Sequence, residues 1–444
     1  MVSLAVLLVF VLPAPLPAVD FDPQPIEVPG EVCGDMAEFA SLDEWAASAD
    51  CAKTFLLGVL EVSQPTRVDS QEPPDPEAQT SSLSEFVERG NRLKEAGQLG
   101  AALDEYRAGL AAHPGGSRDL FLAMGGIFTE EKRFLEALAA LAVALKFDPE
   151  NQEMLYDVGI GFENMYLDEI ALEAFRRVVE AEPRHGRAQR NIGFVLLRQD
   201  KPEEALEPLG IALDIDPTDW KAHTNIATAY ADTEDAIRAE LKEIVARRRP
   251  GARDPNDPSE PRRAELVVKL HAVDYRVKTL EHRREAVRWN PDEALVWYGL
   301  GTTLLDRGDS VSLSEAITAF QKALAIEPGY YAALRNLVSA QKQSARYEEA
   351  YQTCLTMRET SGEEWWLFAT MADIQVKLGR YDEAGKNYLA AIRLNDRDVH
   401  SLLGMAELSR KLGRNAESEE WVQKVEQIDP ELARSHRWFV KNGY

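Results

Sequence analysis

The sequence predicts an all-α repeat protein, because three kinds of residue recur at a constant spacing along most of the chain. Small residues recur every 34 or 35 positions, alanines follow them by twelve, and prolines follow the alanines by twelve again. The small residues are Gly90, Gly125, Gly159, Gly193 and Ala227, the alanines Ala102, Ala137, Ala171 and Ala205, and the prolines Pro114, Pro149, Pro183 and Pro217. Small residues let two antiparallel helices approach closely, and a proline marks where the second helix stops. We therefore expect repeated helix–turn–helix units.

Composition and charge exclude some classes of function. Of the 444 residues, 45% are hydrophobic and 28% are charged, which is typical of a chain that buries a core. The net charge of −25 disfavours attraction to the phosphate backbone, so no nucleic-acid partner is expected. The three cysteines show neither CxxC nor Cys/His spacing, and the sequence therefore predicts no metal site.

Residues 1–18 are predicted to be a signal peptide. They carry no charged side chain, and their apolar run is followed by prolines at positions 13, 15 and 17. The small residue Ala18 stands where signal peptidase would cut. We therefore expect an exported protein, periplasmic or secreted. The alternative is a chain that an uncleaved N-terminal segment anchors to a membrane.

Two further segments precede the repeats. Residues 19–62 are expected to form a small acidic helical segment, in which Cys33 and Cys51 flank an apparent helical stretch. In an oxidising compartment these cysteines are candidates for a disulfide, and two free thiols are the alternative. Residues 63–82 combine proline, serine and acidic residues with few apolar ones, which predicts a disordered linker.

The repeats are predicted in two arrays, residues 83–233 and 294–432, separated by an irregular region at 234–293. This region contains a basic, proline-rich loop, followed by either a degenerate repeat or one long helix. The motif Trp289-Asn290-Pro291 ends the segment as the other repeats end and favours a degenerate repeat. A stripe with four-three spacing favours the long helix. Its members are Leu266, Leu270, Val273, Val277 and Leu280. Residues 433–444 are expected to form a capping helix.

The repeats resemble the tetratricopeptide repeat (TPR) family in motif as well as in period. Trp297-Tyr298-Gly299-Leu300-Gly301 is similar to the opening motif of that family. Tyr381-Asp382-Glu383-Ala384, Tyr347-Glu348-Glu349-Ala350 and Phe134-Leu135-Glu136-Ala137 are similar to the start of its second helix. The resemblance implies a right-handed superhelix of about nine clear repeats plus one degenerate repeat. Its concave groove would be lined by the first helix of each repeat.

The resemblance also implies a noncatalytic scaffold that binds extended peptide or protein segments in this groove. The sequence contains no HExxH, GxSxG, P-loop or dinucleotide fingerprint, so neither an enzyme nor a cofactor is expected. The alternative function is an assembly or accessory subunit of an envelope enzyme or secretion complex. Self-association is a further option, since repeat stacks can join at their ends.

Three asparagines are candidate peptide-binding residues. Asn191, Asn225 and Asn336 occupy the same repeat position, two residues before the small column. An amide both donates and accepts hydrogen bonds, so a row of amides can pair with an extended backbone without selecting its side chains. This resembles the asparagine ladder in the repeat domain of the O-linked N-acetylglucosamine transferases. The alternative is that these asparagines serve packing within the stack.

Nearby cations are further candidates. Arg190, Lys221 and Arg335 stand beside the asparagines in an otherwise acidic protein. Such cations could bind a carboxylate-rich or C-terminal peptide segment. The alternative is that they are solvated helix charges paired within the stack.

Overall fold

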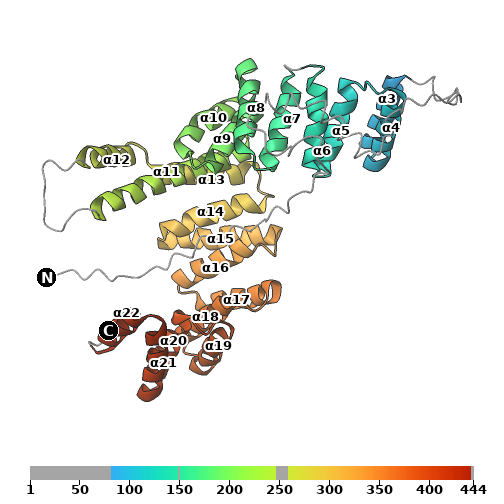
Figure 1. Ribbon diagram of the computed structural model, residues 1–444. Coiled ribbons are helices and arrows are strands. Elements are labelled where there is room, and N and C mark those ends of the chain that lie inside the picture. The colour runs from blue at the N-terminus through green and yellow to red at the C-terminus, as the bar shows by residue number, and fades with distance from the viewer. Residues whose placement is uncertain (1–81, 149–150, 247–258, 442–444) are drawn as a thin grey trace. The chain divides into compact units, whose positions relative to one another are not determined.

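The computed structural model describes residues 82–148, 151–246 and 259–441, and all regular elements in these ranges are α-helices (Figure 1). The predicted signal peptide, the acidic segment with Cys33 and Cys51, and all but the last residue of the predicted linker lie outside the described residues. None of the helices in the described ranges has the length and apolar character that crossing a membrane requires. The chain forms two compact bodies, which meet in sequence between Val178 and Val179.

The N-terminal body consists of helix pairs. Its helices are α3 (Leu83–Glu95), α4 (Leu99–Ala112), α5 (Arg118–Glu130), α6 (Phe134–Leu145), α7 (Gln152–Asn164) and α8 (Asp168–Ala181), the last of which ends just beyond the boundary. α3 packs on α4, and α5 packs on α6. Tyr156 of α7 lies 5.7 Å from Phe175 of α8, measured between ring centroids. The predicted helix–turn–helix repeats are therefore present here.

The C-terminal body continues the pattern. Its helices begin with α9 (Gly186–Arg198), α10 (Pro202–Ile215), α11 (Trp220–Ala246), α12 (Glu260–Ala272), α13 (Tyr275–Trp289), α14 (Ala294–Arg307) and α15 (Ser310–Ile326). They end with α16 (Tyr331–Gln343), α17 (Tyr347–Ser361), α18 (Trp365–Lys377), α19 (Tyr381–Leu394), α20 (Val399–Lys411), α21 (Asn415–Ile428) and α22 (Pro430–Lys441). Consecutive helices pair from α14 to α21, and α22 packs on α21. The last helix thus begins before the predicted capping segment.

Small residues allow the two helices of a repeat to pack closely. A Cβ atom added at Gly159 would lie 2.5 Å from Cε1 of Phe175, and one added at Gly301 would lie 2.6 Å from Cε1 of Phe320. Both phenylalanine rings are fully buried. Each ring therefore occupies the space that the missing side chain leaves, as the spacing of the small column predicts.

The turn inside most repeats contains one residue in the left-handed backbone conformation. This residue is glycine at Gly97, Gly308, Gly379 and Gly413, with φ between 68° and 75°. It is another residue at Lys132, Tyr166, Asp200 and Ala345, with φ between 55° and 60°. A left-handed residue ends the first helix and reverses the chain, and glycine adopts this conformation without a steric penalty.

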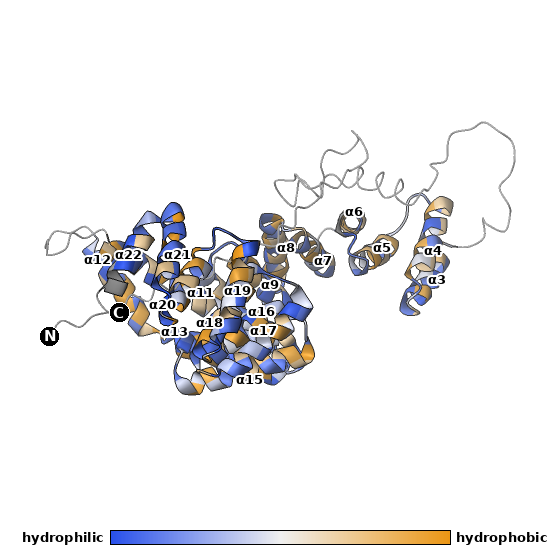
Figure 2. Ribbon diagram, turned by 90° about the horizontal axis from the view of Figure 1, so that it is seen from below, coloured by the Kyte–Doolittle hydropathy of each residue, from blue (hydrophilic) through white to orange (hydrophobic). Residues whose placement is uncertain are grey.

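Most helices carry hydrophilic and hydrophobic residues together (Figure 2), as helices do when one side faces a core. In the C-terminal body, one buried cluster joins α14, α15 and α16 around Phe320. A second cluster joins α16, α17 and α18 around Cys354 and Met371. Each cluster therefore connects one repeat to the next, which is how a repeat array gains stability.

The irregular region differs from the long-helix expectation. α11 is 27 residues long and runs across the predicted boundary at residues 233 and 234. The stripe that favoured one long helix is divided, because α12 ends at Ala272 and α13 begins at Tyr275. Asp274 caps α13, since its carboxylate accepts a hydrogen bond from the backbone N–H of Val277 at 3.1 Å. The stripe thus does not form one continuous helix, and it does not form a separate degenerate repeat either, since the helix that pairs with α13 is α11 and not α12. α13 packs along α11.

Candidate functional site

The first helices of successive repeats form one face of the C-terminal body. Contacts join α9 to α11, α14 to α16, and α18 to α20. Side chains of α16 also reach α14 and α18, as described below. We call this surface the first-helix face. It carries the predicted asparagines and cations, so its geometry decides what these residues can bind.

Asn336 is linked to the repeat before it. Its Nδ2 atom lies 3.5 Å from Oη of Tyr298 on α14, and the amide remains half-buried rather than enclosed. The ring centroid of Tyr298 lies 5.0 Å from that of Tyr330. Burial raises the pKa of Tyr298, so its phenol stays protonated at neutral pH. Asn336 therefore makes one long contact and keeps hydrogen-bonding capacity for a ligand.

Arg335 lies over an aromatic ring of the following repeat. Its Cζ atom is 5.1 Å from the ring centroid of Trp366 on α18, and Tyr331 meets the same indole edge-on at 6.2 Å. In the described part of the chain, no carboxylate lies within ion-pair distance of Arg335. The guanidinium is thus oriented by a cation–π contact and not neutralised by an acid.

Asp373 is the centre of a polar cluster that connects four helices. It accepts hydrogen bonds from Oη of Tyr388 at 2.7 Å and from Nε2 of His400 at 3.0 Å, and Nζ of Lys342 lies 3.9 Å away. Burial alone would raise the pKa of Asp373, but the hydrogen bond and charge of His400, with Tyr388 and Lys342, hold it below its usual value. The hydrogen bond to Asp373 raises the pKa of His400. This polar cluster thus links α16, α18, α19 and α20.

The remaining predicted residues lie on α9 and α11. Asn191 is 6% exposed, whereas Asn225 is half-buried. Nη1 of Arg190 lies 2.7 Å from Oδ2 of Asp219, and both side chains are largely buried. Arg190 is therefore paired within the stack. Lys221 is exposed, with its Nζ 5.5 Å from the ring centroid of Trp220.

Arg283, which the sequence analysis did not identify, also reaches the first-helix face. It comes from the second helix α13, yet its guanidinium contacts α11 and α14. Nη1 donates to the backbone oxygen of Thr224 at 3.3 Å, and Nη2 donates to Oγ1 of Thr228 at 3.1 Å. A Cβ atom added at Gly299, the α14 residue at the asparagine position, would lie 3.0 Å from Nη1. Gly299 therefore leaves room for Arg283 where other repeats carry an amide.

A cavity of about 310 Å³ lies between α11, α13 and α14. Its lining residues are Ala231, Glu234, Asp235, Arg276, Thr279, Thr303, Asp306 and Arg307. Glu234 pairs with Arg238 and with Arg276, the latter at 3.1 Å. Burial, and then the charge of Asp235, raise the pKa of Asp306. The acidic groups of this cavity therefore repel one another.

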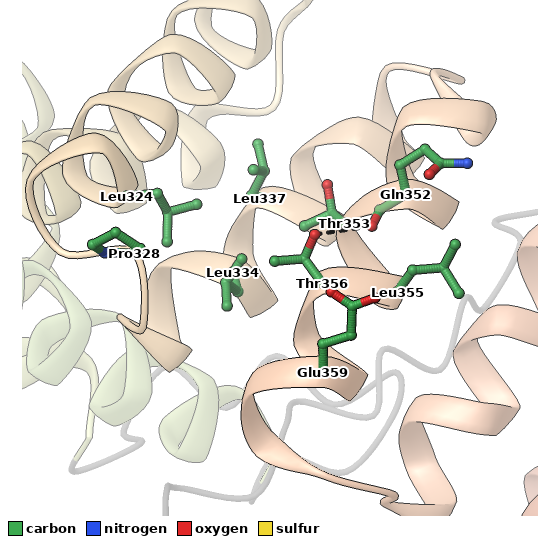
Figure 3. A pocket seen from close by; sticks show the side chains of 9 residues that line it. All are labelled: Leu324, Pro328, Leu334, Leu337, Gln352, Thr353, Leu355, Thr356 and Glu359. Atoms are coloured by element: carbon green, nitrogen blue, oxygen red, sulfur yellow. Dashed lines mark hydrogen bonds between the residues drawn. The ribbon is translucent and has the colours of Figure 1, made fainter.

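A larger cavity of about 500 Å³ lies between α15, α16 and α17 (Figure 3). Leu324, Leu334 and Leu337 line one part of it, while Thr356 and Glu359 of α17 line another. None of the predicted site residues contributes to it. We call this cavity the outer groove, because α15 and α17 are second helices.

Metal and thiol chemistry find little support in the described ranges. Within them, no group of three or more His, Cys, Asp or Glu side chains is arranged to hold a metal ion. Cys354 is buried, and burial raises the pKa of its thiol to about 12. It therefore remains protonated and packs in the core between α16, α17 and α18.

Comparisons with protein families identify the repeat. One model of the tetratricopeptide repeat matches residues 87–152, 169–220 and 370–433, and a second matches residues 312–374. Together these segments cover more than half of the chain.

Curated relatives match in part. The peroxisomal targeting signal receptor of Kluyveromyces lactis is 27% identical over 260 residues, which are 50% of this chain and 45% of the relative. The BBSome complex member bbs-4 of Caenorhabditis elegans is 25% identical over 141 residues, which are 32% of this chain and 30% of the relative. The chain thus spans less than half the length of both relatives.

Solved structures are also similar. A tetratricopeptide repeat protein from Parabacteroides merdae matches with a TM-score of 0.38 and 16% identity, covering 64% of this chain and 96% of that one. YrrB, described as a TPR protein with an unusual peptide-binding site, matches with a TM-score of 0.33 and 16% identity, covering 52% and 96%.

Proposed function

Because this chain belongs to the tetratricopeptide repeat family and is a repeat scaffold for protein interactions, we propose that its first-helix face binds an extended peptide or protein segment without catalysis. The observation that carries this proposal is the continuity of polar and aromatic side chains across successive repeats. Asn336 of α16 contacts Tyr298 of α14, while Arg335 and Lys342 of α16 lie close to Trp366 and Asp373 of α18. Such a row can follow an extended chain from one repeat to the next.

The chemistry of this row suits a main chain. Asn225 and Asn336 are half-buried, so their amides are held in place while part of each remains accessible. An amide can donate to a backbone carbonyl and accept from a backbone N–H. Trp366 adds apolar contact area at a low cost in side-chain entropy. The proposed ligand is therefore an extended segment whose backbone pairs with the amides.

The name of one relative supports the proposal that the ligand is a protein segment. The name of the Kluyveromyces lactis relative describes a receptor for a targeting signal. A receptor of that kind recognises a segment of another protein, which is the class of ligand proposed for this chain. The exported location predicted from residues 1–18 would place such binding outside the cytoplasm.

The second candidate is an assembly or accessory subunit of an envelope enzyme or secretion complex. The outer groove favours this candidate, because Leu324 and Leu355 provide partly exposed apolar side chains on the second helices α15 and α17, beside Leu334 and Leu337 of α16. A stable subunit contact needs such apolar area more than it needs amides. The two candidates therefore predict different binding surfaces on the same body.

A peptide-display selection separates the two surfaces. A random peptide library is selected on the intact chain, and the affinities of the enriched peptides are measured by fluorescence anisotropy. The Asn225→Ala, Asn336→Ala double variant should bind about thirtyfold more weakly, since each of the two lost hydrogen bonds contributes about 1 kcal/mol. The matched control is Gln321→Ala, Gln352→Ala, which removes two exposed amides from the second helices α15 and α17.

Circular dichroism first confirms that both double variants are folded. Unchanged affinity in the asparagine variant would contradict the first proposal. Weaker binding in the glutamine variant alone would assign binding to the second helices and favour the outer groove, because Gln352 lines that groove.

A further inference from the structure

One side of the second helix α15 is exposed to solvent. Val311 begins this side and is 67% exposed, although its side chain is apolar. The exposed side continues through Ser314, Glu315, Thr318, Gln321, Lys322 and Ala325. These residues recur every three or four positions and therefore lie on one side of the helix. We call them, together with Val311, the α15 face.

The α15 face carries little charge. Glu315 and Lys322 are the only Asp, Glu, Lys or Arg residues among the 17 of α15, whereas the second helix α13 has seven among its 15 residues. Thr318, at the centre of the face, donates its hydroxyl to the backbone oxygen of Ser314 at 3.1 Å. This hydroxyl therefore needs no further partner when the face is covered. Surfaces that become buried in protein interfaces are likewise depleted in charge.

The two charged residues lie on either side of Thr318 and differ in their partners. Glu315, three residues before it, accepts a hydrogen bond through Oε2 from Nη2 of Arg284 at 3.0 Å. Lys322, four residues after it, is exposed and has no carboxylate within ion-pair distance in the described part of the chain. Lys322 can therefore gain an ion pair from another molecule, and Glu315 can accept a second cation beside Arg284.

We propose that the α15 face binds the α15 face of a second copy of this chain, with the two helices antiparallel about a twofold axis at Thr318. Three and four residues of a helix correspond to rises of about 4.5 Å and about 6 Å. Glu315 therefore lies almost level with Lys322 of the second copy, and Ser314 lies almost level with Gln321. The twofold axis repeats each contact, so one face supplies both members of every pair.

The direction of these side chains around the helix agrees with the pairs. At about 100° per residue, Glu315 and Lys322 are turned from Thr318 to one side, by about 60° and about 40°. Ser314 and Gln321 are turned to the other side by similar angles. In the antiparallel pair, each side of one helix meets the same side of the other. A parallel pair would instead place Glu315 against Glu315 and Lys322 against Lys322, so the charges select the antiparallel arrangement.

Apolar contacts complete the two ends of the α15 face. Val311 is seven residues before Thr318 and Ala325 is seven residues after it, so each Val311 meets Ala325 of the second copy about 10 Å from the axis. The small residues Ser314, Thr318 and Ala325 allow the helices to approach closely. One helix from each copy buries less than the roughly 1,200 Å² of a standard interface, and we therefore expect a weak, reversible dimer.

Sedimentation velocity of the full chain, measured over a series of concentrations, tests this dimer. We expect a monomer–dimer equilibrium. Lys322→Glu should weaken dimerisation about tenfold, because two attractive pairs become two repulsive ones, and Glu315→Lys should weaken it by a similar factor. The double variant Glu315→Lys, Lys322→Glu exchanges the two charges and should regain the dimer. An equal mixture of the two single variants should also dimerise, since every pair then joins opposite charges.

Two controls accompany these variants. Lys386→Glu makes the same change at an exposed position of the second helix α19 and should leave dimerisation unchanged. Circular dichroism confirms that each variant is folded. The Asn225→Ala, Asn336→Ala variant should dimerise as the original chain does, because the α15 face is separate from the first-helix face. The dimer is therefore tested independently of the proposed function.

Three results would overturn the inference. A chain that remains monomeric at every concentration would leave the α15 face to a different partner. A dimer that Lys322→Glu does not weaken would place the contact elsewhere on the molecule. A folded double variant that does not regain the dimer would show that Glu315 and Lys322 do not face each other across a twofold axis.

Discussion

The regular repeats from α14 to α21 and the interrupted repeat of α11 and α13 hold their helices together in different ways. In a regular repeat, an apolar ring packs into the space at a small residue, as Phe320 does at Gly301. In the interrupted repeat, polar side chains far apart in sequence add to the apolar contacts between α11 and α13. Nδ1 of His223 lies 2.9 Å from Nδ1 of His282, and Arg283 bonds to Thr228. The pairing of helices in a regular repeat thus depends on residues that are close in sequence. The pairing of α11 with α13 also depends on particular residues that are distant in sequence.

The largest expected effect tests the apolar side of this comparison. Gly301→Ala should lower the free energy of unfolding by about 1–3 kcal/mol, because the new Cβ would meet the ring of Phe320 at 2.6 Å. The matched control is Gly210→Ala on α10, where an added Cβ meets nothing within 4 Å. Urea denaturation followed by circular dichroism measures both.

The control should be stabilised by about 0.5–1 kcal/mol, because alanine is the better helix former. Equal effects of the two substitutions would show that the phenylalanine ring is not what requires glycine at position 301. Regular repeats would then be held by some other contact.

The second prediction concerns the pH dependence of stability, because the two regions contain histidines whose pKa values are shifted in opposite directions. Burial, followed by the charges of His223 and Lys278, lowers the pKa of His282 to about 4, whereas Glu281 and Glu285 act in the opposite sense. Between about pH 6.5 and about pH 4, His282 therefore binds a proton in the denatured chain but stays neutral in the folded protein. The stability that neutral His282 contributes is present above about pH 6.5 and is lost as the pH falls towards 4.

His400 has the opposite effect on the pH dependence of stability. The hydrogen bond to Asp373 raises its pKa above 6.5, so its contribution is complete below that pH and is lost as the pH rises through the folded value. Acidification from about pH 8 to about pH 5 should therefore weaken α11–α13 packing while it strengthens the Asp373 cluster.

Hydrogen exchange, corrected for the intrinsic rate at each pH, measures both regions in one sample. We expect a loss of about 1–2 kcal/mol in α13, less than the full pKa shift implies because the ring is partly exposed. His282→Phe should remove the pH dependence of α13, and His271→Gln on exposed α12 should leave it unchanged. Protection that changes in the same direction in both regions would contradict the opposite signs.

The same contrast explains how much the sequence could predict. The columns around Gly159 and Gly301 predicted the pairing of helices, because each contact lies within one repeat and depends on residue size. Arg283 could not be found in this way. Its partners, Thr224 and Thr228, lie more than fifty residues earlier, and an insertion separates them. Only the fold brings these side chains together.

The sequence left the break between α12 and α13 undecided for a related reason. An apolar stripe reports which side of a helix faces a core, and it continues through Val273 although the backbone there is extended. Asp274 was the available signal, since an aspartate favours the N-cap position. The outcome for Arg190 is similar, because its pairing with Asp219 depends on how α9 and α11 meet.

The smallest expected effect concerns the turn of a regular repeat. Ala345 has φ of 55°, whereas the aligned residues Gly379 and Gly413 have φ of 75°. A left-handed conformation costs an L-residue about 1–2 kcal/mol, and a substitution by glycine removes this cost. Part of the gain is lost again, because glycine has greater conformational freedom in the denatured chain. Ala345→Gly should therefore stabilise the protein by about 0.5–1 kcal/mol, measured by urea denaturation.

The reverse substitution, Gly379→Ala, serves as the matched control and should destabilise by a similar amount. Neither position has a crowded neighbour, because Ala345 is exposed and an added Cβ at Gly379 meets nothing within 4 Å. The two changes therefore isolate backbone conformation from packing. If Ala345→Gly lowered stability instead, the strain at this turn would be relieved by contacts of the alanine methyl group. The local backbone would then contribute less to regular pairing than the φ values indicate.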